Sequence, residues 1–191
     1  QSAELLQVEH GQSNSHEVFD WVKSFEPDAV ILYGTSIIKP PLLEYYDGRM
    51  INIHLGLSPY YRGSGTNFWP LVDGIPECVG ATIHLATLEV DAGDILVQVR
   101  PENLKPVDRA HELGTKTIIS GFKKMCEVIP AYLNGKITPF AQDLSIGKVC
   151  KRKDFNPESV LKMWENFNEG MMAKYIEEKE DRDEKFPILQ F

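Results

Sequence analysis

The chain has 191 residues and a formal net charge of -8, and 42% of its residues are hydrophobic. These values are typical of one globular domain, and the negative charge excludes a general positive field that would gather nucleic acid or an anionic membrane. No apolar run approaches the ~20 residues of a membrane-spanning helix. Three cysteines (Cys78, Cys126 and Cys150) lie far apart, which favours a reduced, cytoplasmic protein over a disulfide framework.

The first hundred residues alternate between helical and strand patterns. In chain order they predict a helix (15–28), a strand (29–35), a short helix (40–48), a strand (50–55), a turn or short helix (66–74) and two strands (79–86 and 94–102) around a loop (87–93). The strand at 29–35 is a continuous apolar run, so we expect it to be covered on both faces. This alternation predicts an α/β fold with a mostly parallel sheet.

The second half of the sequence is predicted to be mostly helical. Asp108 caps a long helix that ends at Asn134-Gly135, and Asn156 caps a second one. The second helix has an apolar stripe that we interpret as packing surface: Val160, Leu161, Trp164, Met171 and Tyr175. We expect the apolar end of the chain to dock on the body or on a second copy, which leaves a homodimer open. The predicted units are residues 1–140 and a C-terminal helical extension, residues 141–191.

Polar side chains cluster at the end of the strand at 50–55. Asn52 and His54 point to the same face because side chains alternate along a strand, and ligand sites in α/β sheets lie beyond such strand ends. Asp91 follows in a loop that Gly93 makes flexible. An amide that stabilises an oxyanion, an imidazole that moves protons and a carboxylate that orients it suit attack on a carbonyl. With no serine or cysteine placed as nucleophile, the attacking group would be a substrate amine or water.

Two stretches of the sequence resemble the folate-dependent formyltransferases. They are "NIHLGLSPYYRG", from Asn52 to Gly63, and "GATIHLATLEVDAGDILVQ", from Gly80 to Gln98. The family includes glycinamide ribonucleotide, methionyl-tRNA and sugar-nucleotide formyltransferases. The resemblance implies a Rossmann-like fold and 10-formyltetrahydrofolate as formyl donor.

The resemblance also assigns residues to roles. It implies that Asn52 stabilises the oxyanion, that His54 is the general acid, and that Asp91 supports His54 and helps to remove a proton from the amine. The donor would lie against backbone groups of two segments: Ser36, Ile37 and Ile38 in one, and Thr87, Leu88, Glu89, Val90 and Asp91 in the other.

The sequence departs from the family pattern in two places. Leu55, Gly56 and Ser58 replace the usual Pro, Ser and Leu, which puts the shape of the loop or the acceptor in question. The family's opening strand also has no counterpart in residues 1–14, and the chain does not begin with Met. Either the chain is the later part of a longer natural chain and lacks its N-terminal strands here, which is the interpretation we favour, or the protein builds its acceptor site differently.

Several residues have two interpretations at this stage. Arg62 either binds a ligand phosphate or carboxylate or braces its own loop, and His84 either contacts substrate or is a core histidine. The basic residues Lys148, Lys151, Arg152 and Lys153 are either solvated or contact a nucleotide phosphate. A metal site of His54, His84 and Asp91 is disfavoured, because no dense ligand spacing is present and Asn52 would have no role.

The acceptor is predicted to be a small-molecule amine, a nucleotide-linked amino sugar. Formyl transfer to glycinamide ribonucleotide or methionyl-tRNA is the alternative. The excess of acidic over basic residues and the short C-terminal tail argue against tRNA as the acceptor. A formyltetrahydrofolate hydrolase and a non-catalytic folate- or partner-binding domain also remain open. Neither nucleic acid nor membrane is expected as a partner.

Overall fold

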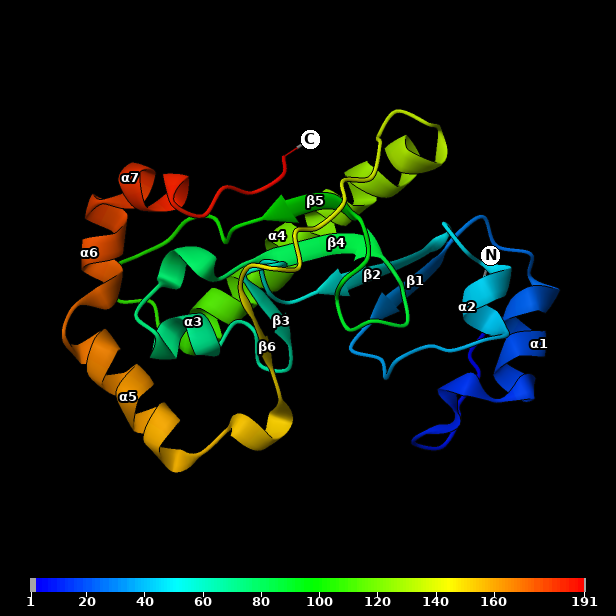
Figure 1. Cartoon of the computed structure of the whole chain (residues 1–191), viewed down its shortest axis with the longest axis horizontal. Coiled ribbons are helices and arrows are strands. Elements are labelled where there is room, and N and C mark those ends of the chain that lie inside the picture. Colours follow the sequence, from blue (N-terminus) through cyan, green and yellow to red (C-terminus); the bar gives the residue numbers. More distant parts are fainter. Residues whose placement is uncertain (1–2, 191) are drawn as a thin grey trace.

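The computed structural model describes residues 3–190 and has a four-stranded sheet at its centre (Figure 1). In spatial order the strands are β1 (Val30–Tyr33), β2 (Met50–His54), β4 (Ala81–Leu85) and β5 (Ile95–Val99). A separate two-stranded sheet pairs β3 (Tyr61–Gly63) with β6 (Lys148–Cys150). The α-helices are α1 (His16–Ser24), α2 (Leu42–Tyr45), α3 (Trp69–Val72), α4 (Ala110–Leu133), α5 (Pro157–Asn168), α6 (Met171–Glu177) and α7 (Lys179–Glu184). Short 3-10 turns are η1 (Gln12–Asn14), η2 (Pro76–Cys78) and η3 (Arg152–Asp154). The predicted α/β class is confirmed.

Strand directions in the central sheet are mixed. β1 and β2 run parallel through a crossover that contains α2, whereas β2 with β4 and β4 with β5 pair antiparallel. Parallel pairing, as predicted, therefore holds for β1–β2 and for β3–β6. The chain turns back from β4 to β5 through the loop at 86–94, and this loop is too short for the crossover of about a dozen or more residues that a parallel return needs.

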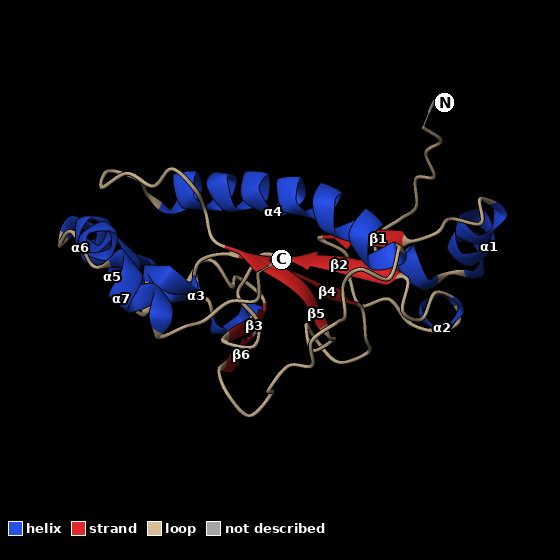
Figure 2. Ribbon diagram, turned by 90° about the horizontal axis from the view of Figure 1, so that it is seen from above, coloured by secondary structure: helices blue, strands red, loops and turns tan. Residues whose placement is uncertain are grey.

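The long helix α4 lies along one face of the central sheet (Figure 2). Ile51 and Ile53 of β2 are fully or almost fully buried in the same cluster as Val128 of α4. Because side chains alternate along a strand, Asn52 and His54 face the other side of the sheet, as predicted. None of the described helices is long and apolar enough to cross a membrane.

The outer strand β1 is less covered than predicted. Its side chains Ile31 and Tyr33 are 39% and 43% exposed, although Tyr33 makes an edge contact with Phe122 of α4. Leu32, on the opposite face, is buried in a cluster with residues of α1 and α2. The expectation of a strand covered on both faces is wrong because α4 reaches only part of this edge of the sheet.

The C-terminal helices pack against α3 and the first turns of α4. The buried residues of this cluster include Met163 and Phe167 of α5, whereas the predicted stripe residues Leu161 and Trp164 are 63% and 46% exposed. The stripe prediction was wrong in phase within α5, where Ser159, Met163 and Phe167 form the buried face. Met171, at the start of α6, is buried as predicted.

The end of the chain docks on the body of the same molecule. Gln98 of β5 donates its backbone N–H to the carbonyl of Leu189 at 2.7 Å, and its side-chain oxygen accepts from Leu189 N at 3.1 Å. Arg100 and Tyr60 donate to the carbonyls of Phe186 and Pro187 at 2.6 and 2.8 Å. The segment after residue 140 therefore shares contacts with the central sheet, and a division of the chain at that point stays a prediction.

Candidate active site

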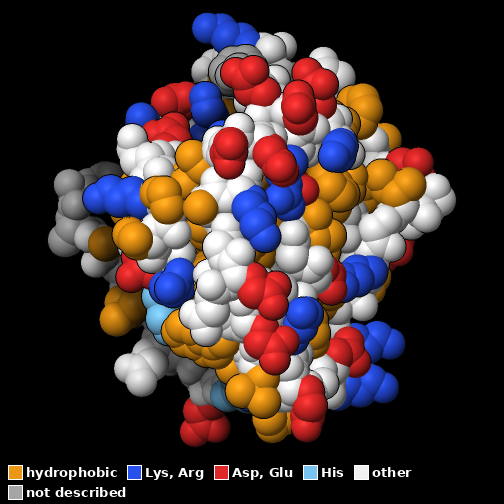
Figure 3. All heavy atoms as spheres, turned by 90° about the vertical axis from the view of Figure 1, so that its left-hand side faces the viewer, with side chains coloured by type: hydrophobic (Ala, Val, Ile, Leu, Met, Phe, Trp, Pro, Cys, Tyr) orange, Lys and Arg blue, Asp and Glu red, His pale blue; other side chains and the backbone are white. Residues whose placement is uncertain are grey.

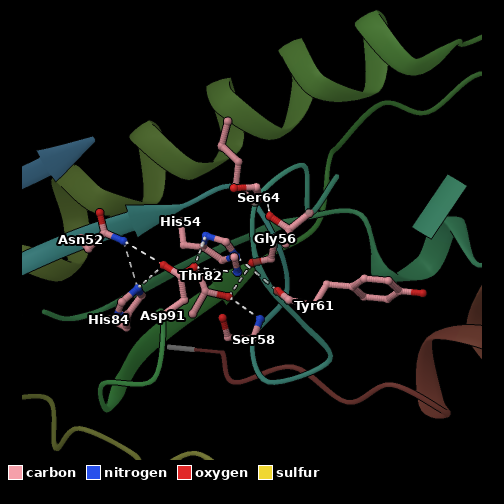
Figure 4. Close-up of polar contacts among 12 residues, drawn as sticks. Asn52, His54, Gly56, Ser58, Tyr61, Ser64, Thr82, His84 and Asp91 are labelled. Atoms are coloured by element: carbon pink, nitrogen blue, oxygen red, sulfur yellow. Dashed lines mark hydrogen bonds and ion pairs between the residues drawn. The ribbon is translucent and has the colours of Figure 1, made fainter. Parts of the chain in front are cut away.

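A cavity of about 720 Å³ opens at the carboxyl ends of β1 and β2, where α/β sheets usually bind ligands. This volume is in the range of small-molecule sites. Four segments form its walls: residues 32–38, 52–55, 63–68 and part of 84–91. Asn52, His54 and Asp91 all line it, so the structure brings the three predicted catalytic residues together (Figure 4).

Asp91 lies at the centre of a polar cluster. Its Oδ2 accepts from Gly63 N at 2.9 Å and is 3.3 Å from His54 Nδ1, while its Oδ1 accepts from Asn52 Nδ2 at 3.5 Å. Burial alone would raise the pKa of this carboxyl. The His84 ring, the charge that His54 can carry and the Gly63 N–H outweigh burial, so the pKa of Asp91 lies below its ordinary value. Asp91 is therefore ionised at neutral pH.

His54 is buried and has an acceptor on each side of its ring. Nδ1 faces the Asp91 carboxylate at 3.3 Å, and Nε2 faces the Tyr61 carbonyl at 3.2 Å. Only a doubly protonated ring can donate to both acceptors, so the site can hold a proton on His54. Burial nevertheless lowers the pKa of His54 below its ordinary value, against the pull of Asp91. A group balanced in this way is suited to give up a proton during a reaction.

His84 orients Asn52. The Asn52 amide nitrogen Nδ2 lies 3.1 Å from His84 Nε2, which is also 3.6 Å from Asp91 Oδ1, and His84 Nδ1 donates to the carbonyl of Leu85 at 2.8 Å. His84 is 2% exposed, and it also lines the cavity. His84 is therefore a hydrogen-bonded core residue with one edge at the cavity, and its contact with substrate stays a prediction.

The loop that contains Asp91 is tightly fixed. Asp91 has a φ of 48°, and a Cβ on Gly93 would lie 1.8 Å from the carbonyl oxygen of Leu85. Gln142 donates from Nε2 to the carbonyls of Asp91 and Gly93 at 3.0 and 2.6 Å. Sequence analysis did not identify Gln142, because nothing in its neighbourhood indicates that residues so far along the chain return to this loop.

The first predicted donor-binding segment forms one wall of the cavity. Ser36, Ile37 and Ile38 all line it. Asn14, which sequence analysis missed, holds this segment with both ends of its amide: Nδ2 donates to the Ile37 carbonyl at 2.9 Å, and Oδ1 accepts from Lys39 N at 2.7 Å. In the described part of the chain, no backbone hydrogen bond engages the N–H groups of residues 36–38. They are therefore available to a ligand.

The second predicted segment lines the cavity with one exception. Thr87, Glu89, Val90 and Asp91 contribute to the wall, but Leu88 does not and is 57% exposed. The Leu88 side chain points into solvent, and contact of the donor with the backbone of Leu88 stays a prediction.

Arg62 is not part of the cavity wall. It is 6% exposed, and its guanidinium Nη1 lies 3.8 Å from Glu89 Oε1. Its Nε has no hydrogen-bond partner among the described residues. This position favours bracing of the loops over direct contact with a ligand, and a contact with substrate stays a prediction.

Gly56, one of the departures from the family pattern, touches the site closely. A Cβ at this position would lie 2.6 Å from His54 Nε2 and 2.6 Å from Thr66 Cβ. Thr66 is buried, and it fills the space by donating to the Leu55 carbonyl at 2.6 Å. The glycine therefore allows the 63–68 loop to close over His54.

Among residues 3–190, no group of three or more His, Cys, Asp or Glu side chains is arranged to hold a metal ion. Asn52 instead contacts both His84 and Asp91 through hydrogen bonds of its amide.

The family model described as formyl transferase matches residues 2–129 of this chain. The chain therefore belongs to the formyl transferase family. It is 34% identical to the methionyl-tRNA formyltransferase of Geobacillus sp. (strain WCH70) over 131 residues, which are 66% of this chain and 40% of the relative. The chain spans about two fifths of the length of the first such curated relatives.

Solved structures of the same family have a similar Rossmann-like fold. The formyltransferase PseJ from Anoxybacillus kamchatkensis, in complex with UDP-4,6-dideoxy-4-formamido-L-AltNAc and tetrahydrofolate, is 29% identical with a TM-score of 0.56. That match covers 72% of this chain and 82% of PseJ. The phosphoribosylglycinamide formyltransferase from Streptococcus pneumoniae TIGR4 is 27% identical with a TM-score of 0.54, covering 61% of this chain and 64% of that one.

Proposed function

We propose that this chain transfers a formyl group from 10-formyltetrahydrofolate to the amine of a nucleotide-linked amino sugar. The observation that carries the proposal is the cluster of Asn52, His54 and Asp91 on one wall of a ligand-sized cavity. The opposite wall offers the unpartnered backbone N–H groups of residues 36–38 and apolar side chains such as Ile38. Such a wall fits a flat heterocycle with polar edges, which is the form of a pteridine.

The chain's own residues can perform each proton step. The donor, when bound, supplies the formyl carbon that the amine attacks. Asn52 Nδ2 would exchange its long 3.5 Å hydrogen bond to Asp91 Oδ1 for one to the carbonyl oxygen as negative charge develops there, which is the role of an oxyanion-hole donor. The bond from carbon to the new amine forms, and the bond from carbon to the donor nitrogen breaks. The amine thereby loses one proton, and the released nitrogen gains one.

Asp91 and His54 can balance these protons. Asp91 is ionised, so it can accept the proton that the amine loses, and His54 can supply the one that the leaving nitrogen needs. The 3.3 Å separation of Oδ2 and Nδ1 would let a proton pass between the two groups and restore the starting state. Tyr61, through its carbonyl, favours the protonated ring and so prepares His54 as the acid.

The acceptor is inferred from the chain's charge and from one relative. The match to PseJ covers most of PseJ, and that protein's complex contains a UDP-linked formamido sugar. The formal charge of -8 opposes tRNA as acceptor. The 34% identity to a methionyl-tRNA formyltransferase favours a second candidate, formyl transfer to methionyl-tRNA.

The test is release of tetrahydrofolate from 10-formyltetrahydrofolate, with and without a panel of nucleotide-linked 4-amino and 3-amino sugars. We expect release that depends on one sugar, with a formamide product of matching mass. Release without any amine would instead indicate a hydrolase, and release only with methionyl-tRNA would establish the second candidate. Heat protection by 5-formyltetrahydrofolate tests donor binding separately, and its absence at high excess would contradict the proposal.

A further inference from the structure

We propose that Lys151, Arg152, Lys153 and Phe155 bind the nucleoside diphosphate end of the acceptor. This inference rests on the proposed function, and it assigns to that function a site outside the residues that line the cavity. We call these four residues the basic rim. They follow β6 directly: Arg152 and Lys153 form part of the short turn η3, and Lys151 and Phe155 flank it.

The basic rim lies beside the catalytic carboxylate through β3. Gly63 N donates to Asp91 Oδ2, and Gly63 pairs with Cys150, the residue before Lys151. Ser64, on the cavity wall, donates its backbone N–H to the Cys150 carbonyl at 2.8 Å. The path from Asp91 to Lys151 therefore has three steps: the hydrogen bond to Gly63, the spacing between the paired strands, and one residue along the chain. Together they span on the order of 10 Å. A sugar that carries a diphosphate can span such a distance with its amine at Asp91.

The cations of the basic rim have no partner in the described part of the chain. Lys151, Arg152 and Lys153 are exposed, and none of them has an ion pair there. Their basic neighbour Lys148 differs, because it is paired with Asp73. The nearest acid in sequence, Asp154, instead accepts the backbone N–H of Lys151 at 2.7 Å.

The charge distribution elsewhere sets this turn apart. On the face formed by the C-terminal helices, acidic and basic side chains are interspersed (Figure 3). In the protein as a whole, 28 acidic residues outnumber 20 basic ones. Three consecutive unpaired cations beside a cavity are therefore a local exception, and they can bind two adjacent phosphates.

Phe155 adds an aromatic surface at the same place. Its ring packs against Phe68, a residue of the cavity wall, with ring centroids 5.2 Å apart, yet it is 58% exposed. An aromatic ring that is held on one side and open on the other is a platform on which a base can stack. Cations for phosphate and a ring for the base together recognise a nucleoside diphosphate.

Isothermal titration of the whole chain with UDP, dTDP and inorganic pyrophosphate tests this inference. The rim variant combines Lys151→Ala, Arg152→Ala and Lys153→Ala. The control combines Lys105→Ala, Lys136→Ala and Lys174→Ala, which removes the same charge from exposed positions elsewhere. We expect the rim variant to weaken a nucleoside diphosphate at least tenfold, with less than a twofold effect of the control. Phe155→Ala should weaken the nucleoside diphosphate but leave pyrophosphate unchanged.

The inference is overturned if the intact chain binds neither diphosphate, or if the rim variant binds as tightly as the control. Heat protection by 5-formyltetrahydrofolate, measured on the same samples, separates the two proposals. If protection persists without diphosphate binding, only the basic rim is disproved, whereas loss of both disproves the proposed function as well. Binding of unacylated tRNA that the rim variant loses, without diphosphate binding, would overturn the inference in favour of an RNA acceptor.

Discussion

The two walls of the cavity are held in different ways. On the wall of β2 and β4, His54 and His84 are buried, and each of them has a hydrogen-bond or ion-pair partner at both ring nitrogens. On the wall of residues 36–38, the backbone is fixed from outside by Ser13 and by the two ends of the Asn14 amide. The first wall is part of the sheet, whereas the second is a loop attached by a few exposed contacts.

Under the proposed function, this difference divides the groups that would do the chemistry from the groups that would bind the donor. Groups that act on one atom need a geometry held to within about 0.5 Å, which strands and buried hydrogen bonds provide. A binding wall tolerates small movements, so a tethered loop is sufficient. Changes to the first wall should therefore lower turnover, and changes to the second should weaken binding of the donor.

The largest effect is expected for Asp91→Asn. Asparagine tolerates the positive φ at this position and can still accept from Gly63, so the fold should be retained. The variant cannot accept the amine proton or stabilise a charged His54, so kcat should fall about 10²- to 10⁴-fold. Tetrahydrofolate release measures the loss, and heat protection by 5-formyltetrahydrofolate serves as the control. Turnover within about threefold of the parent would show that the assignment of Asp91 is wrong.

Gly56→Ser restores the residue that the family usually has and should nevertheless be harmful here. Its Cβ would meet both His54 and Thr66 at 2.6 Å, so one of the two must move. Overpacking of this kind costs about 1–3 kcal/mol of unfolding free energy, and displacement of His54 should also lower kcat. Denaturant unfolding and turnover measure the two losses. The double variant Gly56→Ser/Thr66→Gly, which removes both the Cβ and the hydroxyl that the new side chain would meet, should lose less stability relative to Thr66→Gly than Gly56→Ser loses relative to the parent; an equal loss would contradict the proposed clash with Thr66.

The sequence predicted the first wall better than the second. Period-two alternation placed Asn52 and His54 on one face, because that rule depends only on strand geometry. Asp91 was proposed from its place in the loop between two predicted strands, and the resemblance added its role. Asn14 and Gln142 could not be found in this way, since their roles arise from contacts between segments more than twenty residues apart. The exposed positions of Leu161 and Trp164 were missed because the prediction joined them to Met171 and Tyr175 in one continuous helix, whereas α5 and α6 are separate helices on either side of Gly170.

The lowered pKa of His54 predicts how stability depends on pH. The unfolded chain binds a proton at His54 near the ordinary value of 6.5, and the folded chain binds it only at lower pH. Between these two pKa values the unfolded state holds more protons than the folded state. The contribution of neutral, buried His54 to the free energy of unfolding is therefore complete above pH 6.5, and it is lost as pH falls through the folded pKa. Denaturant unfolding should therefore give a lower free energy at pH 5.5 than at pH 7.5.

A histidine variant isolates this effect. His54→Gln should lose less stability over the same pH interval, whereas His111→Gln, at an exposed position of α4, should behave as the parent does. Equal losses in all three proteins would show that His54 is not responsible. Asp91, whose pKa is also lowered, loses its contribution only at more acidic pH, as pH falls from 3.8 through its folded pKa.

Asn14→Ala tests the second wall. The variant removes the hydrogen bonds to the Ile37 carbonyl and the Lys39 N–H, each worth about 1 kcal/mol. The KM for the donor should rise about 5- to 30-fold, while kcat changes less than about twofold, because β2 and β4 are untouched. Ser13→Ala, which removes only the contact with Ser36, is the milder comparison. A fall in kcat at unchanged KM would mean that the two walls do not divide chemistry from binding.

The smallest effect is expected at Leu88. It allows a side chain outside the cavity to be compared with one that lines the cavity in the same turn. Leu88 is exposed outside the cavity, whereas Val90, two residues further on, lines it. Leu88→Ala should leave the KM for the donor within about twofold, since it removes no contact with the ligand. Val90→Ala should raise it several-fold, because each methylene lost from an apolar contact costs about 0.8 kcal/mol. Steady-state kinetics of the pair, at saturating acceptor, measure the difference. A rise in KM of the same size for both variants would place the donor over the outer side of the turn and not in the cavity, because only there could it touch Leu88 as closely as Val90.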